Sequence, residues 1–264
     1  MFENDFTIDQ NYNDYTSQCH ITWKRLYRRQ ANILVDRAAP EFLDAMKDLE
    51  IESEIIPNFE KLSDRLEKRT GWRIVAVPGL IPDDVFFYHL SNKRFPVTNW
   101  IRPPEKFEYI QEPDVFHDIY GHVPLLANPF FSNFLQLYGE KGLRANGKEN
   151  LHYLARLYWY TVEFGLIQTS NGLRIYGSGI ASSPGESVYC LESSIPNRIK
   201  FKLDRIMQTN YIIDTYQSVY FVIDSYEQLF NEVNSKLSDL YPVLKNNNDY
   251  SPETVLPTDK FVNI

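Results

Sequence analysis

Two short segments constrain this chain more than any other feature of its sequence. Residues 113–122 contain His117 and His122, and residues 158–165 contain Glu163. Together they offer two imidazoles and one carboxylate, the ligand set that holds a ferrous, non-heme iron on one face and leaves its other coordination positions open. The sequence therefore predicts a fold that brings these segments to one iron ion, and an open iron site indicates oxygen chemistry.

The spacing of the two histidines carries information of its own. His117 and His122 are five residues apart, and a regular helix would place them about 140° apart around its axis. We expect the helix to end at Gly121, so that the freed backbone swings His122 back toward His117. The spacing differs from that of zinc proteases, whose helical histidines are four residues apart. Taken alone, the segment fits a buried core histidine and a helix-capping histidine better than two ligands.

Glu163 changes that balance. Its helical neighbours at three and four residues are all aromatic or aliphatic, so its carboxylate is predicted to face the core. An unpaired buried charge is too costly to persist, so the group is neutralised, paired with a base or bound to a metal. A salt bridge to Arg156 or to another cation is as good an interpretation as metal ligation when this segment is taken alone.

Four motifs occur in order along the chain. They are Glu112 to His117, Gly121 to Leu126, Trp159 to Gly165 and Tyr176 to Ser183. In their residues, order and spacing they resemble the pterin-dependent aromatic amino acid hydroxylases, in particular the bacterial members that act on phenylalanine. The similarity extends from about Gly71 to Val222, and four ordered motifs are unlikely to match by chance.

The resemblance implies a metal site and a reaction. Fe(II) would be bound by His117, His122 and Glu163, with tetrahydropterin as electron donor and O2 as co-substrate. The implied activity is hydroxylation of L-phenylalanine to L-tyrosine.

Three residues receive catalytic roles through the resemblance. Asp118 matches an acidic residue near the pterin and oxygen site, Tyr158 is placed near iron and pterin, and Ser182 matches a serine beside an iron-binding histidine. Asp114 is expected to orient a ligand imidazole. Without the resemblance, a solvated helix carboxylate is an equally good interpretation of Asp118, and Tyr158 would be interpreted as a packing residue.

The resemblance also assigns the pterin site. Gly79 and Leu80 match the loop that cradles the pterin, and Phe86 matches the aromatic residue that stacks on it. A flat heterocycle suits both contacts, and Tyr158 is expected beside it. Unaided, Phe86 would be assigned to the core.

Three residues are expected to bind the amino acid substrate. Arg102 matches the arginine that grips the substrate carboxylate, although on the sequence alone it is better interpreted as a surface residue. Trp159 stands where members acting on tryptophan tend to carry Phe, and its larger indole narrows the pocket to a single ring. Ile213 stands where members acting on tyrosine carry Asp, so the phenol hydroxyl has no partner there. Phenylalanine is the predicted substrate.

Composition narrows the class of protein. The chain has 264 residues, is 43% hydrophobic and carries a net charge of −8, which fits one enzyme domain and argues against nucleic acid as a partner. Its start lacks a signal-peptide pattern and no apolar stretch approaches membrane-spanning length, so we expect a cytoplasmic protein with no membrane partner. Cys19 and Cys190 are too few for a disulfide framework and are expected to be ordinary thiols.

Periodicity predicts the fold class. Apolar residues recur at three- and four-residue spacing, mixed with charged ones, as in helices packed on one side. The predicted helices cover residues 38–49, 57–69, 82–91, 129–141, 148–168 and 225–240. Apolar runs at Arg73 to Val77, Leu173 to Tyr176 and Val219 to Ile223 predict strands, too few for a central sheet. The expected fold is mainly α with a small β component, and the resemblance makes it the hydroxylase catalytic fold.

We expect a single catalytic domain over residues 1–264. An N-terminal arm of about residues 1–35 is expected to be irregular from Thr7 to Asn32, and an irregular C-terminal tail covers about 246–264. Animal members of the family carry a preceding regulatory domain and a coiled-coil tail; this chain is too short for the first and lacks the heptads of the second. The oligomeric state, monomer or small homo-oligomer, stays open.

Three alternatives remain at this point. The nearest is a tryptophan or tyrosine hydroxylase of the same family. A zinc hydrolase can use the same two histidines and glutamate. The third is a non-catalytic helical protein in which these residues form a structural or metal-binding network.

Overall fold

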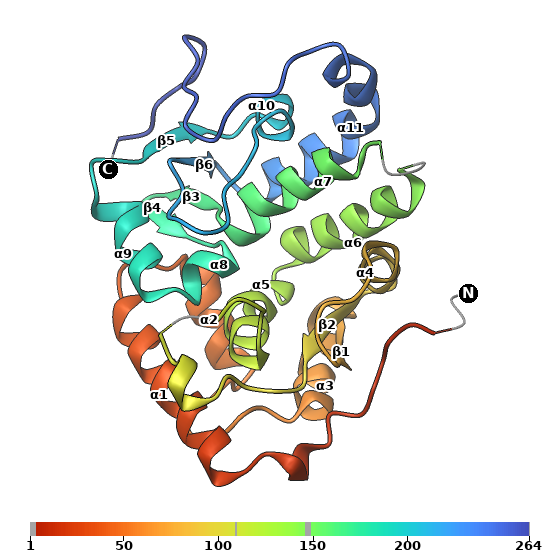
Figure 1. Cartoon of the computed structure of the whole chain (residues 1–264), viewed down its shortest axis with the longest axis vertical. Coiled ribbons are helices and arrows are strands. Elements are labelled where there is room, and N and C mark those ends of the chain that lie inside the picture. Colours follow the sequence, from red (N-terminus) through yellow and green to blue (C-terminus); the bar gives the residue numbers. More distant parts are fainter. Residues whose placement is uncertain (1–3, 109, 146–148, 264) are drawn as a thin grey trace. The chain divides into compact units, whose positions relative to one another are not determined.

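The computed structural model describes residues 4–108, 110–145 and 149–263 of the chain, and its elements are mostly helical (Figure 1). The prediction of a mainly α fold with a small β component is confirmed. The chain divides into two compact units. The first comprises Met1–Asn32 and Pro40–Leu143, and the second comprises Ile33–Ala39 and Arg144–Ile264.

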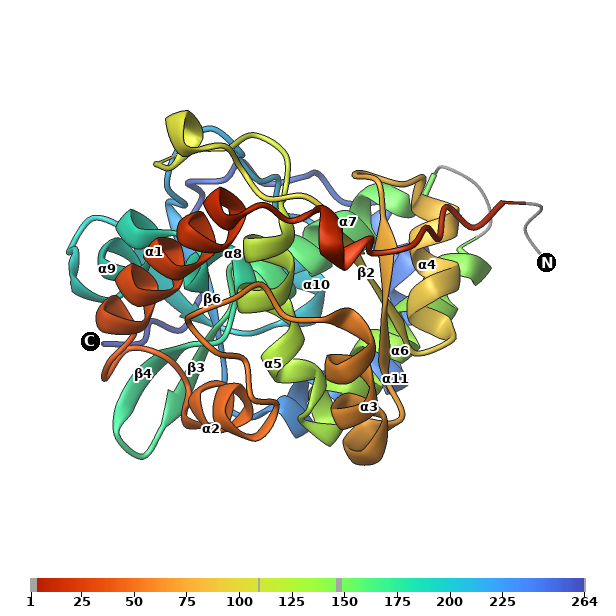
Figure 2. The same cartoon turned by 90° about the horizontal axis from the view of Figure 1, so that it is seen from below.

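The first unit contains a parallel pair of strands packed with helices. Its elements are η1 (Tyr12–Asp14), α1 (Ser17–Ile33), α2 (Pro40–Asp48), α3 (Phe59–Thr70), β1 (Arg73–Val77), α4 (Asp83–Ser91), β2 (Arg94–Thr98), η2 (Pro104–Lys106), η3 (His117–His122), α5 (Val123–Leu126) and α6 (Pro129–Arg144). Strands β1 and β2 pair in parallel, and α4 connects them and lies beside β2 (Figure 2). Parallel strands need such a crossover connection. The loop after β1 and the start of α4 therefore lie at the carboxyl end of β1.

The second unit is built on a four-stranded sheet. Its elements are α7 (Leu151–Tyr158), η4 (Trp159–Glu163), β3 (Leu166–Thr169), β4 (Gly172–Ile175), α8 (Ser178–Ala181), α9 (Pro184–Glu192), β5 (Asn197–Lys200), α10 (Leu203–Met207), β6 (Val219–Ile223) and α11 (Tyr226–Leu244). The strand order is β4-β3-β6-β5, with β3 and β4 antiparallel and the other pairs parallel. All five residues of β6 are buried, as expected for an apolar run in the middle of a sheet.

The expectation of an irregular N-terminal arm is wrong for most of its length. Residues Ser17–Ile33 form helix α1, whose buried positions are Thr22, Trp23, Leu26 and Gln30. These positions recur every three or four residues, which is the helical period. The many aromatic and basic residues in this segment obscured that stripe in the sequence.

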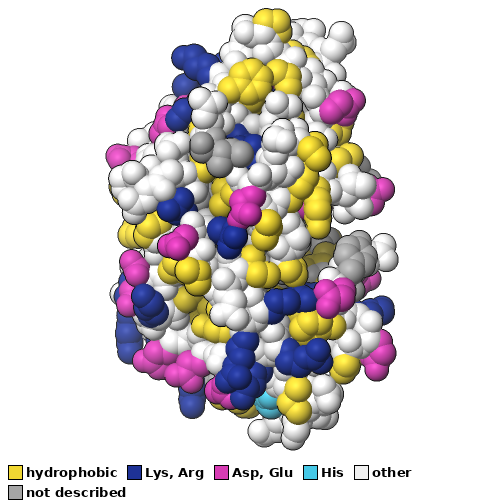
Figure 3. Space-filling view, turned by 90° about the vertical axis from the view of Figure 1, so that its left-hand side faces the viewer, with side chains coloured by type: hydrophobic (Ala, Val, Ile, Leu, Met, Phe, Trp, Pro, Cys, Tyr) yellow, Lys and Arg dark blue, Asp and Glu magenta, His cyan; other side chains and the backbone are white. Residues whose placement is uncertain are grey.

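Three of the four Lys and Arg side chains of α1 form ion pairs with described residues. Lys24 and Arg28 both contact Glu54, with N to O distances of 2.5 and 2.8 Å. Figure 3 shows the same pattern over one face of the molecule, where Lys and Arg side chains lie among Asp and Glu. Such exposed pairs contribute little to stability, so they mainly balance local charge.

Two further expectations are corrected in the second unit. The predicted helix over 148–168 stops at Glu163, and Leu166–Thr169 is strand β3. Gly165 lies between them, where an added Cβ would come within 2.4 Å of the Thr161 carbonyl oxygen, so the chain turns where only glycine fits. The expectation of too few strands for a central sheet is also wrong, since four strands form one sheet in this unit. Strands β3 and β5 were not predicted because they are short and lack a strong apolar signal.

The C-terminal tail is irregular, as expected, but it is fixed to the unit. Tyr250 forms a bridge with Thr209, and Phe261 with Ile199. The side chain of Asp259, which is 6% exposed, pairs with Arg205 at 3.1 Å. Cys19 and Cys190 are both free thiols. None of the helices in the described part of the chain combines the length and apolar character needed to cross a membrane.

Candidate metal centre

The two histidines lie on a π-helical segment, η3. A π-helix closes its hydrogen bonds between residues five apart, so its wider turn places His122 above His117. Their Nε2 atoms are 3.1 Å apart and the two rings are nearly perpendicular, at 83°. The expectation that the helix ends at Gly121 is therefore wrong: η3 continues into α5, and a widened turn, not a helix end, brings the imidazoles together.

Asp114 fixes the start of this segment. It lies immediately before the helix, and its Oδ1 accepts the backbone N–H of His117 at 3.1 Å, the pattern of an N-cap residue. The guanidinium of Arg102 donates to both oxygens of Asp114, from Nε at 2.8 Å and from Nη2 at 2.9 Å. The expectation that Asp114 orients an imidazole is thus corrected, because the contact is to the histidine backbone.

The Arg102 and Asp114 pair is buried, with 6% and 0% of each residue exposed. Burial opposes ionisation of Asp114, but the hydrogen bonds and charge of Arg102 outweigh it and lower the pKa of that carboxyl. Arg102 is therefore not a surface arginine. Its Nε and Nη2 serve Asp114, and Nη1 makes no hydrogen bond to any described residue.

Asp118 is buried beside the first histidine. Its Oδ2 accepts the backbone N–H of Thr98, at the end of β2, at 2.7 Å. Burial raises the pKa of this carboxyl to about 7, against the lowering effect of the Thr98 hydrogen bond. The interpretation as a solvated helix carboxylate is therefore excluded.

Glu163 is the last residue of the second π-helical segment, η4. The Ser178 hydroxyl lies 2.9 Å from Glu163 Oε2 and 3.0 Å from the Val162 carbonyl oxygen. Gly177 permits this close packing, because an added Cβ there would lie 2.4 Å from the Glu163 carbonyl oxygen. Arg156, the predicted salt-bridge partner, instead pairs with Asp249 at 2.6 Å.

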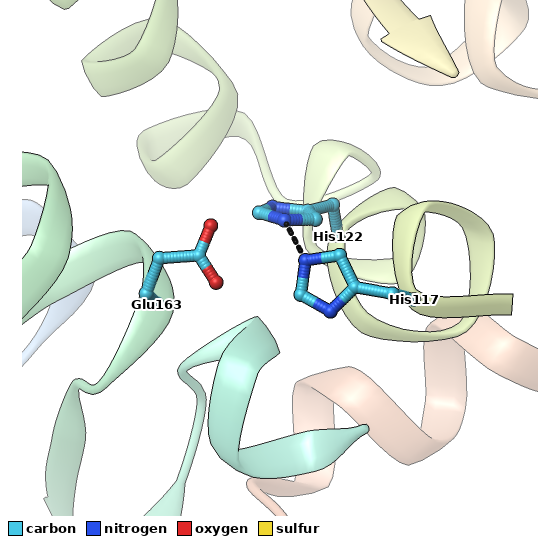
Figure 4. A group of neighbouring side chains, drawn as sticks. All are labelled: His117, His122 and Glu163. Carbon is cyan, nitrogen blue, oxygen red and sulfur yellow. Dashed lines mark hydrogen bonds between the residues drawn. The ribbon is translucent and has the colours of Figure 1, made fainter. Parts of the chain in front are cut away.

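His117, His122 and Glu163 form a group that can hold a metal ion, with one ligand atom from each lying within 4.8 Å of the others (Figure 4). Two atoms that bind one ion at about 2.1 Å and at right angles are about 3.0 Å apart, close to the histidine separation of 3.1 Å. Two imidazoles and a carboxylate suit Fe(II) with open positions. The same donors also occur in catalytic zinc sites.

The residues expected to bind pterin lie at one end of the parallel strand pair. Gly79 and Leu80 follow β1, and Phe86 lies on α4. An added Cβ on Gly79 would meet nothing within 4 Å, and Leu80 is 74% exposed. Phe86 is half-buried. This loop is open, with apolar side chains available.

The other residues with predicted catalytic roles lie in the second unit. Tyr158 ends α7 and is half-buried. Ser182 follows α8, and its hydroxyl donates to the Ser178 carbonyl oxygen at 2.9 Å. Their roles stay predictions.

Trp159 and Ile213 have different surroundings. The Trp159 indole stacks on Tyr211, with ring centroids 4.5 Å apart, and packs against Phe164 at 4.7 Å. Its Nε1–H donates to Gln217 Oε1 at 3.1 Å. Ile213, in contrast, is 72% exposed. The residue of this segment that stacks on the indole is Tyr211. Sequence reasoning missed Tyr211 and Gln217, and only their position near the predicted substrate residue Ile213 gave a signal.

Comparison with known proteins identifies the family. A profile described as biopterin-dependent aromatic amino acid hydroxylase matches residues 7–255. Phenylalanine-4-hydroxylase of Chromobacterium violaceum is 53% identical over 260 residues, covering 98% of this chain and 88% of the relative. The enzyme of the same name from Ralstonia nicotianae is 52% identical over 240 residues, covering 91% and 77%.

Solved structures agree. The Chromobacterium violaceum phenylalanine hydroxylase with bound Fe(III) superposes with a TM-score of 0.96 at 52% identity, covering 98% of this chain and 94% of that one. A cobalt-bound structure of the same enzyme also gives 0.96. The chain belongs to the biopterin-dependent aromatic amino acid hydroxylases.

Proposed function

We propose that this chain is a phenylalanine 4-monooxygenase, which converts L-phenylalanine to L-tyrosine with O2 and tetrahydropterin at an Fe(II) site. The observation that carries the proposal is the grouping of His117, His122 and Glu163 in a member of this family. Six bacterial relatives named phenylalanine-4-hydroxylase are 42–53% identical, whereas a tyrosine 3-monooxygenase is 36% identical.

His117, His122 and Glu163 would hold the iron, which together with the reduced pterin supplies the activation of O2. The chain's own contribution is to fix these donors. Asp114 holds the His117 backbone, and Ser178 holds one oxygen of Glu163. Donors fixed in this way need little reorganisation on binding.

Asp118 is proposed as a proton-holding group beside the metal ligands. Its Oδ2 is occupied by the Thr98 N–H, so Oδ1 is the atom that can carry the proton. With its pKa raised to about 7 by burial, the carboxyl exchanges that proton near neutral pH. Tyr158 and Ser182 are proposed to line the same site, in keeping with their positions in the family motifs.

For the pterin we propose the loop of Gly79 and Leu80 together with Phe86. The space around Gly79 and the exposure of Leu80 leave room for a flat ring. Phe86 offers an aromatic face suited to stacking on it.

For the amino acid we propose Arg102, Trp159 and Ile213. Nη1 of Arg102 makes no hydrogen bond to a described residue and is the group proposed to bind the substrate carboxylate, because Nε and Nη2 donate to Asp114. Trp159 limits the ring size of the substrate. Ile213 offers no polar partner to a phenol hydroxyl, so tyrosine is disfavoured.

One assay tests the proposal. The apoprotein is loaded anaerobically with Fe(II) and then given O2, tetrahydropterin and phenylalanine, and tyrosine is measured. Tyrosine formation that needs all four components is expected, and tryptophan and tyrosine serve as competing substrates. Tyrosine formation that persists with zinc in place of iron, or without pterin, would contradict the proposal.

A further inference from the structure

Gln217 occupies a buried position next to the residues proposed to select the substrate. It is 1% exposed. Its Oε1 accepts the indole N–H of Trp159 at 3.1 Å, and its Nε2 donates to the carbonyl oxygen of Ile212 at 2.9 Å. One amide therefore joins the π-helical segment η4 to the segment 211–216.

The backbone of Gln217 is fixed as well. Its N–H donates to Glu186 Oε1 at 3.2 Å, and the hydroxyl of Tyr220 donates to the same oxygen. Glu186 lies on α9 and is 4% exposed. The amide of Gln217 thus projects from a position tied to both α9 and β6.

The segment joined by this amide is otherwise exposed. Residues 213–216 are all exposed, although Tyr211 stacks on the indole with an angle of 18° between the rings. Tyr216, at the other end, packs against Tyr189 with centroids 4.8 Å apart. Ile213 therefore lies on a short span whose path depends on its two ends and on the bond from Gln217 to Ile212.

Glutamine meets both requirements at once. The indole N–H needs an acceptor and the Ile212 carbonyl needs a donor, and an amide supplies one of each. A glutamate of the same size supplies acceptors only, and a methionine supplies neither strong group. Because the site is buried, water does not readily replace a lost partner, and the unpaired group lowers stability.

We infer that Gln217 is a positioning residue for substrate selection: through a single amide it sets both the tilt of the Trp159 indole and the path of the segment that carries Ile213. The inference rests on the proposed function, because Trp159 and Ile213 select the substrate only if they line the amino acid pocket. It predicts that exclusion of tryptophan depends on Gln217 as well as on the indole itself.

The kinetic test compares Gln217→Met and Gln217→Glu with the parent enzyme. Loss of both hydrogen bonds in Gln217→Met is expected to raise kcat/KM for tryptophan relative to phenylalanine about 5- to 10-fold, as expected for buried hydrogen bonds. Gln217→Glu keeps the acceptor for the indole, so its ratio is expected to change by only about 2-fold. Iron content is expected to stay at the parent level in both variants.

Gln208→Met is the matched control. Gln208 is also buried, at 4% exposed, and its Nε2 donates to the Asn248 carbonyl oxygen at 3.2 Å, whereas the Trp159 indole N–H donates to Gln217. Its variant is expected to lose similar stability with an unchanged substrate ratio. An equal change of ratio in Gln208→Met would overturn the inference, because general loosening would then explain the effect.

A second readout does not depend on activity. In ¹⁵N-labelled protein the four tryptophans give four indole N–H signals, and Trp159→Phe identifies that of Trp159. In Gln217→Met this signal is expected to shift and its hydrogen exchange to become faster. In Gln217→Glu the exchange is expected to stay slow because an acceptor remains, and in Gln208→Met the signal is expected to stay in place. If Gln217→Met does not fold, Gln217→Asn, whose amide is too short to reach both partners, takes its place.

The outcomes separate this inference from the proposed function. A Trp159 signal that is unmoved in Gln217→Met, or a moved signal with an unchanged substrate ratio, would refute the positioning role. A parent enzyme that forms no tyrosine would refute the proposed function, while the indole signal would still test the contact.

Discussion

The chain uses a π-helical segment twice, and the two are supported in different ways. Segment η3 carries two potential ligands within a continuous helix, and a buried ion pair between Arg102 and Asp114 fixes its start. Segment η4 carries one potential ligand, Glu163, at the point where the helix stops. Two neutral groups contact that end, namely the Ser178 hydroxyl and the backbone at Gly177.

This difference separates two tasks. A buried ion pair resists the loss of either partner, because the remaining charge is left without compensation. A hydroxyl that touches the ligand oxygen contributes less to stability but acts directly on the orientation of the donor. We therefore expect changes near η3 to affect mainly folding, and changes near η4 to affect mainly the metal.

The largest expected effect is loss of a ligand in either segment. His117→Ala, His122→Ala and Glu163→Ala are each expected to abolish iron retention and to lower tyrosine formation at least about 1000-fold, since the open iron site needs all three donors. The folded structure should survive. Metal analysis, circular dichroism and product assay measure the three properties.

The two segments are expected to behave alike in that experiment alone. A variant that keeps stoichiometric iron and near-normal turnover would remove its residue from the ligand set. Iron retention in Glu163→Ala alone would show that the metal is bound by the histidines of η3 without Glu163.

The next largest effect separates the segments. Asp114→Asn is expected to lower the free energy of unfolding by about 3–5 kcal/mol, because it leaves the buried Arg102 charge uncompensated. Ser178→Ala is expected to cost only about 0.5–1.5 kcal/mol, yet to weaken iron binding about 10- to 100-fold. Denaturant titrations and metal competition measure the two quantities. Equal stability losses would show that the ion pair is not the main support of η3.

Much of this arrangement followed from the sequence, and the failures have physical causes. The strands Arg73–Val77 and Val219–Ile223 were predicted to the residue, because buried strands are continuous apolar runs. The three ligands were named from donor chemistry and family resemblance. The π-helical turn was not, since no local preference distinguishes it from an α-helix, and five-residue spacing was taken for a helix end.

Buried polar partners were also beyond the sequence. Arg102 appeared to be a surface residue without the resemblance, yet its charge is balanced by Asp114, twelve residues away. Gln217 and Glu186 meet through tertiary contacts. Such pairs depend on the fold and leave no periodic signal in the sequence.

A smaller effect is expected at Arg102, which pairs with Asp114 at the start of η3 and is also proposed to bind the substrate. Arg102→Lys keeps the charge but loses the planar fork, so we expect KM for phenylalanine to rise about 10-fold or more. KM for the pterin should change little. Because the fork also serves Asp114, Lys is expected to lower stability too, and KM is compared at a temperature where both proteins are folded. An unchanged KM would place the carboxylate site elsewhere.

At η4 the corresponding effect concerns specificity. Trp159→Phe is expected to relax the exclusion of tryptophan, and Ile213→Asp to weaken use of phenylalanine and favour tyrosine, each by roughly 1–3 kcal/mol in relative kcat/KM. Competition among the three amino acids measures these ratios. A parent enzyme that prefers tryptophan or tyrosine would overturn the phenylalanine assignment without touching the metal site.

The smallest expected effect is a difference in pH dependence between two buried carboxyls, Asp114 at the start of η3 and Glu186 next to Gln217. The pKa of Asp114 is lowered because Arg102 outweighs burial, so its contribution to stability is full above its ordinary pKa and is lost as pH falls through the lowered value. The pKa of Glu186, which anchors Gln217 behind η4, is raised by burial. The unfolded carboxyl then ionises first, and stability falls as pH rises from about 4 through the raised value.

Asp114→Asn and Glu186→Gln are therefore expected to show opposite trends. The stability deficit of Asp114→Asn should shrink as pH is lowered below the ordinary aspartate pKa. Glu186→Gln still accepts from Gln217 and Tyr220 but no longer titrates, so its stability relative to the parent should increase as pH rises from about 4. Denaturant titrations of both variants and the parent between about pH 2.5 and 8 measure these slopes. Slopes of the same sign would contradict the opposite pKa shifts of these two carboxyls.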